Sequence, residues 1–123
     1  MAEGARLDVA EIQRRLREFA AEREWERFHT PKNLAMALAA EAGELLERFQ
    51  WLTAEESTSL SDEQLRSIAD EVADIQIYLL RLSDVLGIAV SDSVEHKIMQ
   101  NAERYPVELA RGNATKYSRR EEL

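Results

Sequence analysis

The fold of this chain is decided by residues 61–87, SDEQLRSIADEVADIQIYLLRLSDVLG. Apolar residues recur there every three or four positions, which is the period of one face of an α-helix. Ser61 and Gln64 form a capping-box pattern at the start, and Gly87 is a strong stop signal at the end. The pattern predicts one long amphipathic helix, the most apolar of the chain. Its apolar face carries Leu65, Ile68, Val72, Ile75, Leu79 and Leu82.

Three further segments carry helical patterns, and no segment shows the alternation of a strand. Predicted starts rest on capping patterns: Asp8 with Glu11, Thr30 followed by Pro31, and residues 90–92. We expect a connector at residues 25–30 and a polar loop at residues 53–61. The sequence therefore predicts an all-α chain, a four-helix bundle or a variant of one. The segments run from Asp8 to about Glu24, from Thr30 to Trp51, and from residues 90–92 to just before Pro106.

The size and charge of the chain limit its function. Its 123 residues predict one domain over residues 1–110, followed by a polar tail over residues 111–123. The net charge of −8 opposes binding to a nucleic acid polymer, because Lys and Arg supply most of that affinity. The chain has no cysteine, so thiolate chemistry is excluded. We find no signal peptide and no membrane span, and expect a cytoplasmic protein.

Two pairs of carboxylates, Glu41 with Glu44 and Glu71 with Asp74, are candidates for a metal site. Residues three apart share one face of a helix, so two adjacent helices could bring four acids together. Converging carboxylates repel one another unless a cation lies among them. Oxygen ligands suit Mg²⁺ or Mn²⁺, and the absence of a Glu-x-x-His pattern argues against a di-iron bundle. Alternatively, these acids are merely solvated, and the chain is a non-catalytic helical interaction module.

Several separated motifs, in the same order, resemble the MazG-like all-α nucleoside triphosphate pyrophosphohydrolases. The resemblance extends from Phe19 to Tyr117 and is greatest to the dCTP pyrophosphatase branch. It implies Mg²⁺-dependent hydrolysis of a nucleoside triphosphate to the monophosphate and pyrophosphate, with dCTP or a modified pyrimidine dNTP as substrate. The motifs are residues 29–34 (HTPKNL), 41–45 (EAGEL), 49–51 (FQW) and 71–75 (EVADI), with Tyr78, Lys97, Asn101 and residues 104–106 (RYP).

The resemblance also implies roles for single residues. Glu41, Glu44, Glu71 and Asp74 match the family's metal ligands. The broader pattern has a further acid where this chain has Ala40. The general base and the number of ions therefore stay open, with Glu47 as a candidate additional ligand or base. The implied substrate-binding residues are Trp25, Trp51 and Tyr78 for the base, Lys97 and Arg104 for phosphate, and Asn33 and Asn101 for further polar contacts.

The alternatives concern the base and the assembly. The same chemistry on dUTP or another dNTP is the alternative, because spacing does not reveal whether the pocket binds an exocyclic amine or a carbonyl of the base. Leu16 stands where we expect a polar base-reading residue. We assign neither His29 nor His96 a chemical role. The resemblance implies a homo-oligomer, a dimer or a tetramer, with base pockets completed by a neighbouring chain.

Overall fold

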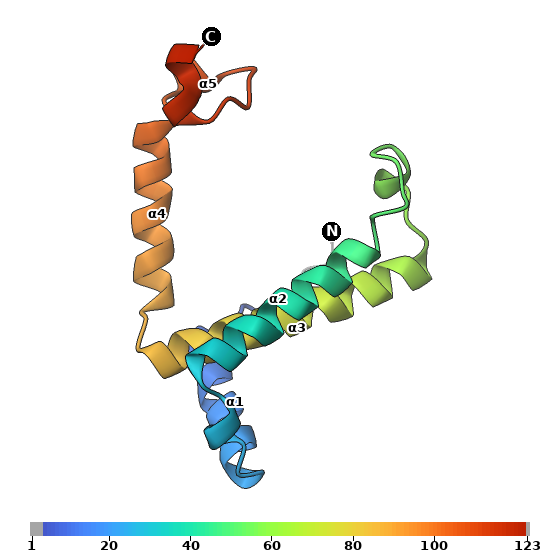
Figure 1. The fold of residues 1–123 in the computed structure, drawn as a ribbon, viewed down its shortest axis with the longest axis vertical. Coiled ribbons are helices and arrows are strands. Elements are labelled where there is room, and N and C mark those ends of the chain that lie inside the picture. The colour runs from blue at the N-terminus through green and yellow to red at the C-terminus, as the bar shows by residue number, and fades with distance from the viewer. Residues whose placement is uncertain (1–3, 123) are drawn as a thin grey trace. The chain divides into compact units, whose positions relative to one another are not determined.

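A computed structural model describes residues 4–122, and this part of the chain is helical with no strand (Figure 1). The all-α prediction is confirmed. No helix among the described residues is long and apolar enough to cross a membrane. The α-helices are α1 (Val9–Glu22), α2 (Pro31–Glu47), α3 (Asp62–Leu86), α4 (Val90–Arg104) and the single turn α5 (Val107–Ala110). Short 3-10 turns are η1 (Glu26–Phe28), η2 (Glu56–Thr58) and η3 (Tyr117–Glu122).

The predicted caps of the central helices are confirmed. The side chain of Thr30 accepts a hydrogen bond from the backbone N–H of Asn33 at the start of α2. Ser61 and Gln64 form a reciprocal capping box at the start of α3. Gly87 ends α3 in the left-handed region, with φ 68°, which favours glycine because it has no Cβ.

Three predicted helix ends need correction. Helix α2 ends at Glu47 and does not reach Trp51, because the backbone N–H of Arg48 donates to the Leu45 carbonyl three residues back and tightens the last turn. Residues 90–92 lie inside the first turn of α4, and Ala89 is its N-cap without a side-chain hydrogen bond. Helix α1 ends at Glu22, slightly before the expected end.

The start of α1 also differs from the capping-box prediction. Asp8 caps the helix by accepting from the backbone N–H of Glu11, as expected. The Glu11 carboxylate instead accepts two hydrogen bonds from the guanidinium of Arg14, so it is not available to the N-cap backbone. The capping box of α1 is therefore incomplete, because only the side chain of Asp8 caps the backbone.

Helices α1, α2 and α3 pack together and position the candidate site. Helices α2 and α3 lie side by side and antiparallel, and α1 packs on α3 (Figure 1). Each contributes one buried apolar residue: Ala20, Leu34 and Leu80 are at most 3% exposed. Gln13 of α1 donates a hydrogen bond to the Leu80 carbonyl at 3.0 Å. The site described below lies on this three-helix unit.

The chain divides into two compact units between Ile88 and Ala89. In the second unit, Tyr105 and Tyr117 pack edge to face at 5.9 Å, and the guanidinium of Arg104 lies 4.6 Å from the Tyr117 ring centre. Gly112, with φ 79°, forms the turn between α5 and η3. The domain over residues 1–110 and the tail over residues 111–123 stay a prediction.

Candidate metal centre and nucleotide pocket

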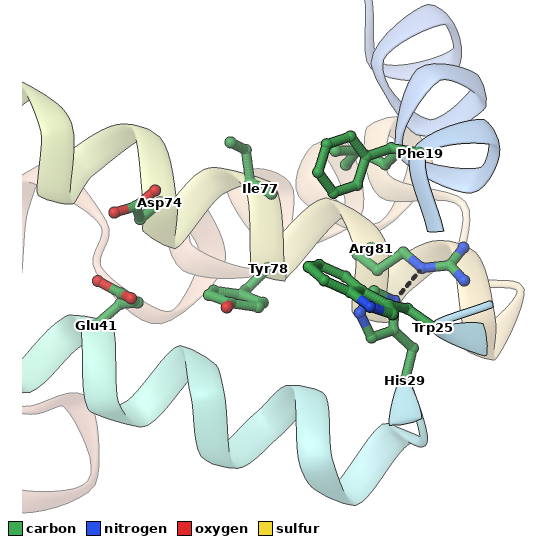
Figure 2. Close-up of a pocket in the computed structure, with 9 residues that line it drawn as sticks. Phe19, Trp25, His29, Glu41, Asp74, Ile77, Tyr78 and Arg81 are labelled. Atoms are coloured by element: carbon green, nitrogen blue, oxygen red, sulfur yellow. Dashed lines mark hydrogen bonds between the residues drawn. The ribbon is translucent and has the colours of Figure 1, made fainter. Parts of the chain in front are cut away.

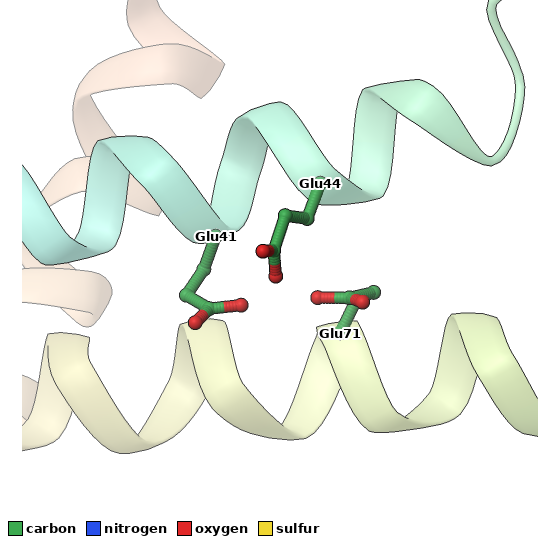
Figure 3. A group of neighbouring side chains, drawn as sticks. All are labelled: Glu41, Glu44 and Glu71. Carbon is green, nitrogen blue, oxygen red and sulfur yellow. The ribbon is translucent and has the colours of Figure 1, made fainter.

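Three of the four predicted metal ligands converge where α2 and α3 face each other. Glu41 and Glu44 project from α2 toward Glu71 of α3 (Figure 3). One carboxylate oxygen of each lies within 4.8 Å of the other two. Three carboxylates at this separation could ligate a single cation. We call Glu41, Glu44 and Glu71 the carboxylate cluster.

The carboxylate cluster contains two buried oxygens without a hydrogen-bond partner among the described residues, Oε2 of Glu41 and Oε2 of Glu71. Glu71 is only 6% exposed. A buried charged oxygen without a partner loses its hydration and gains nothing in return. The two oxygens are thus free to act as ligands. An all-oxygen donor set of this kind fits Mg²⁺ or Mn²⁺.

Arg48, which the sequence analysis did not assign to the site, supplies the nearest positive charge. It follows the last residue of α2, and its Nη2 donates to Glu71 Oε1 at 3.2 Å. The side chain of Arg48 is 47% exposed, so solvent weakens this ion pair. Three cluster carboxylates therefore share one half-exposed guanidinium, which leaves an excess of negative charge.

The pKa values of Glu41 and Glu71 shift in opposite directions. The hydrogen bond that a protonated Glu41 makes to Glu44 is the largest cause that raises the pKa of Glu41 to about 7, followed by burial and a similar bond to Glu71. The negative charges of Glu44 and Asp74 act in the same direction. The hydrogen bond from Arg48 lowers the pKa of Glu71 below its ordinary value. Without a cation, the cluster therefore tends to hold a proton on Glu41.

Asp74, the fourth acid that the sequence analysis assigned to the metal, and Glu47 lie outside the three-carboxylate group. Asp74 is exposed and lines the adjoining pocket beside Glu41. Its charge lies close enough to raise the pKa of Glu41. Its side chain is one methylene shorter than that of a glutamate. Glu47, the last residue of α2, is exposed and lies outside the three-carboxylate group.

A pocket of about 450 Å³ extends from Glu41 and Asp74 along α3 toward α1. Tyr78 lies between these two acids and an aromatic region at the far end (Figure 2). We call Phe19, Trp25, His29 and Arg81 the aromatic end of the pocket. Trp25 and Tyr78, which the resemblance assigns to the base, both line this pocket.

Aromatic contacts hold Trp25 in place. Its ring packs edge to face on Phe19, with 5.7 Å between centres, and on His29, with 6.3 Å between centres. Such pairs contribute about 0.5–1.5 kcal/mol beyond the burial of area. Trp25 is still 43% exposed, so part of its ring remains available to a ligand.

His29 and Arg81 were not identified as site residues from the sequence. His29 lines the pocket, and its Nδ1 accepts a hydrogen bond from Nε of Arg81 at 3.1 Å. Burial first, and then the charge of Arg81, lower the pKa of His29. A signal did exist, since Arg81 interrupts the apolar run Leu79, Leu80 and Leu82. Its partner lies 52 residues earlier, so the sequence did not reveal the contact.

Two other predicted binding residues do not line this pocket. The side-chain amide of Asn33 donates to the Phe28 carbonyl at 3.0 Å, which ties the connector to α2. Trp51 is 86% exposed. The structure therefore gives Asn33 a local role and leaves Trp51 on the surface of the single chain.

The remaining candidates belong to the second unit and are described within it. Lys97 on α4 donates from Nζ to Gln100 Oε1 at 2.8 Å. Asn101 is exposed on the same helix, and Arg104 lies against the Tyr117 ring. Their roles toward phosphate or base stay predictions.

Comparison with known proteins identifies the family. Residues 36–119 match the sequence model of the MazG-like family. This chain belongs to that family. The MazG-like chain is 44% identical over 112 residues to dCTP pyrophosphatase 1 of Bos taurus and 41% identical to that of Homo sapiens. These alignments cover 89% of this chain and 66% of each relative.

A solved structure shows the same fold. The crystal structure of a pyrophosphatase from Archaeoglobus fulgidus DSM 4304 matches with a TM-score of 0.76 and 36% identity. The match covers 86% of this chain and 99% of the archaeal one. The family resemblance predicted from the motifs is confirmed.

Proposed function

We propose that this MazG-like protein hydrolyses a deoxynucleoside triphosphate, dCTP or a modified pyrimidine dNTP, to the monophosphate and pyrophosphate, and so removes it from the nucleotide pool. The observation that carries the proposal is the carboxylate cluster, with two buried unpartnered oxygens, opening through Glu41 into an aromatic pocket. The names of the mammalian and archaeal relatives support the same reaction class.

The metal in this proposal is Mg²⁺, with Mn²⁺ as a substitute. Glu41, Glu44 and Glu71 would hold it, and Asp74 lies next to Glu41 as a further ligand. The unpartnered oxygens and the absence of sulfur or imidazole in the donor set support a hard cation. When bound, the cation supplies neutralisation of phosphate charge and activation of water.

The chain's own carboxylates then handle the proton of the reaction. Water adds to the α- or the β-phosphorus, the α–β bridging oxygen leaves with the other product, and the water proton passes to a carboxylate. Glu47 is the candidate base, because it is exposed at the end of α2 and lies outside the cluster. No covalent intermediate is needed.

The nucleotide base occupies the pocket. Trp25 and Tyr78 offer ring faces for stacking, which contributes about 1–3 kcal/mol for each base. Lys97 and Arg104 neutralise phosphate, and Asn101 adds a polar contact. Asn33 contributes by holding the connector that carries Trp25 and His29. Trp51 completes the pocket of a neighbouring chain.

The assembly is a homo-oligomer, a dimer or a tetramer, in which domain 1–110 completes its four-helix bundle. Four apolar residues of α3 at seven-residue spacing are each 40–51% exposed, as expected for a helix that packs on another chain. Sedimentation analysis would give a mass of two or four chains. A monomer at micromolar concentration would exclude this assembly. The four exposed apolar residues of α3 are Leu65, Val72, Leu79 and Leu86.

The test is a product analysis by chromatography with dCTP, 5-methyl-dCTP, dUTP and the purine dNTPs, in Mg²⁺ and in EDTA. We expect metal-dependent formation of a pyrimidine monophosphate and pyrophosphate. A preference for dUTP would support the proposed hydrolysis but replace dCTP as the substrate. No turnover of any nucleotide by folded protein would refute the enzyme and favour a helical interaction module.

A further inference from the structure

Arg81 is a buried cation at the aromatic end of the pocket, opposite the end where Glu41 and Asp74 lie (Figure 2). It is 8% exposed, so its guanidinium has lost most of its hydration. Its Nε donates to Nδ1 of His29 at 3.1 Å, and its Nη1 lies 3.5 Å from Oδ2 of Asp84. Asp84 also accepts a hydrogen bond from Arg17 at 3.0 Å. The carboxylate thus orients the guanidinium, and the guanidinium orients the imidazole.

The contact between Arg81 and His29 determines where the imidazole proton lies. A guanidinium has only donors, so the nitrogen that faces it must be an acceptor. Nδ1 of His29 therefore carries the lone pair, and a neutral His29 carries its proton on Nε2. Burial and the charge of Arg81 also disfavour a second proton on the ring. Among the described residues Nε2 has no hydrogen-bond partner, which leaves this donor for a ligand.

The other side chains at this end of the pocket are also donors or apolar. The indole of Trp25 can only donate, and Phe19 has no polar atom. The two carboxylates that line the pocket, Glu41 and Asp74, lie at the opposite end (Figure 2). A ligand edge that faces the aromatic end therefore meets donors and must itself present acceptors.

We propose that Arg81 is a positioning residue that holds His29 as the Nε2–H tautomer, and that His29 donates this hydrogen to the 2-carbonyl of a pyrimidine base. The inference rests on the proposed function, because it assumes a nucleotide base in the pocket. It deepens that function by naming the group that is read. Cytosine and uracil both carry this carbonyl and adenine carries none, so the contact favours these pyrimidines over adenine without separating dCTP from dUTP.

The first test reads the tautomer by ¹⁵N NMR of the imidazole nitrogens in the full chain. His29 and His96 are the only histidines, and H96Q assigns the two signals. We expect Nδ1 of His29 to have the shift of an acceptor nitrogen and Nε2 that of a protonated one. A proton on Nδ1, or averaged shifts, in the wild-type protein would overturn the proposal without any variant.

Variants then connect the tautomer to Arg81. R81M keeps the aliphatic stem but removes every donor, so both nitrogen shifts of His29 should move toward the average of two tautomers. R81K retains a donor and should restore the wild-type shifts at least partly. R17Q is the matched control, because it removes the other guanidinium on Asp84 and leaves His29 untouched. Unchanged shifts in R81M would show that Arg81 does not position His29.

The second test uses the α,β-imido analogue of dCTP with Mg²⁺, which cannot be cleaved at the α–β bridge, and its 2-thio derivative, a weaker acceptor. In the wild-type protein and R17Q we expect the 2-oxo ligand to shift the Nε2 signal and to bind about 3- to 10-fold more tightly than the 2-thio ligand. In R81M the guanidinium no longer holds the imidazole, so we expect this preference to be smaller than in R17Q. Equal affinities of the two ligands for the wild-type protein would overturn the proposal that His29 donates to the 2-carbonyl.

Turnover of dCTP, measured on the same sample, separates this proposal from the proposed function. Turnover with no response of His29 to the analogue would refute the role of His29 and leave the enzyme intact. A response of His29 without turnover would refute the enzyme and retain the base contact. Neither turnover nor response would overturn both.

Discussion

At the carboxylate cluster, the buried Oε2 atoms of Glu41 and Glu71 have no hydrogen-bond partner within residues 4–122, whereas the buried guanidinium of Arg81 at the aromatic end contacts two groups. Both regions bury charge on the same helix, α3. The difference is that the cluster has more negative charge than its neighbours neutralise. The aromatic end satisfies its charge within the fold.

The contrast indicates which region needs a bound ligand to neutralise its charge. Folding holds the carboxylates close together, and their mutual repulsion destabilises the metal-free protein. A bound cation removes this repulsion, so metal binding stabilises the folded protein. The aromatic end is already oriented by packing and hydrogen bonds, which lowers the cost of ordering a ligand there. We therefore expect changes at the cluster to affect metal dependence, and changes at the aromatic end to affect nucleotide affinity.

The largest effect is expected for E71Q, which replaces the most buried carboxylate of the cluster. Turnover should fall about 100-fold or more, and thermal stabilisation by Mg²⁺ should disappear, because a cation ligand is lost. D70N alters the neighbouring exposed acid on α3 and serves as the control. Equal behaviour of E71Q and D70N in both assays would show that the cluster holds no functional cation.

A second effect, on affinity, is expected for W25A at the aromatic end. Loss of a stacking partner should raise KM for the nucleotide about 10-fold or more, since stacking is worth about 1–3 kcal/mol for each base. The Mg²⁺ concentration at half-maximal activity should stay unchanged. Steady-state kinetics with each component varied in turn measures both. If W25A weakened the metal requirement as strongly as KM, the two regions would not be separable.

A smaller effect of opposite sign is expected for R48Q at the cluster. Arg48 occupies one oxygen of Glu71 and adds positive charge, so its removal should tighten Mn²⁺ binding about 3- to 10-fold in titration calorimetry. R66Q removes an exposed arginine elsewhere on α3 and controls for net charge. Weaker Mn²⁺ binding in R48Q than in R66Q would mean that Arg48 supports the site.

The smallest effect concerns pH in the metal-free protein. The pKa of Glu41 rises from 4.5 to about 7 on folding, so between these values the folded chain keeps a proton that the unfolded chain releases. The stability that wild-type protein gains from this proton is complete below pH 4.5 and is lost as the pH rises through 7. E41Q mimics the protonated form at every pH.

The comparison of wild-type protein with E41Q isolates this group. The free energy of unfolding of wild-type protein minus that of E41Q, from urea denaturation in EDTA, should decrease from pH 4.5 to 7. The opposite shift of Glu71, whose pKa is lowered, is present in both proteins and cancels to first order. A difference that does not change with pH would contradict the assigned pKa of Glu41.

Local signals predicted the helices well and their tertiary partners poorly. The capping box at Ser61 and the αL glycine at residue 87 depend on neighbours along the chain, so the bounds of α3 followed from the sequence. The end of α2 did not follow from the sequence, because residues 47–52 contain no glycine, proline or capping pattern that would mark the turn at Arg48. Apolar periodicity did not indicate this turn.

The same difference between local signals and tertiary contacts applies to the site. The spacing of Glu41, Glu44 and Glu71 on two helices was sufficient to predict the carboxylate cluster. The spacing could not show that Asp74 would face the pocket, since this depends on the length of its side chain and on packing. Arg48 and Arg81 were missed because the acceptors that they contact belong to other elements.

The most direct test of the account is a crystal structure with Mn²⁺ and the α,β-imido analogue of dCTP, using anomalous scattering to locate the metal. We expect an anomalous peak among Glu41, Glu44 and Glu71, with the base stacked on Trp25 and its 2-carbonyl facing His29. A bound analogue with no metal at these carboxylates, or a base lying outside the pocket, would contradict it.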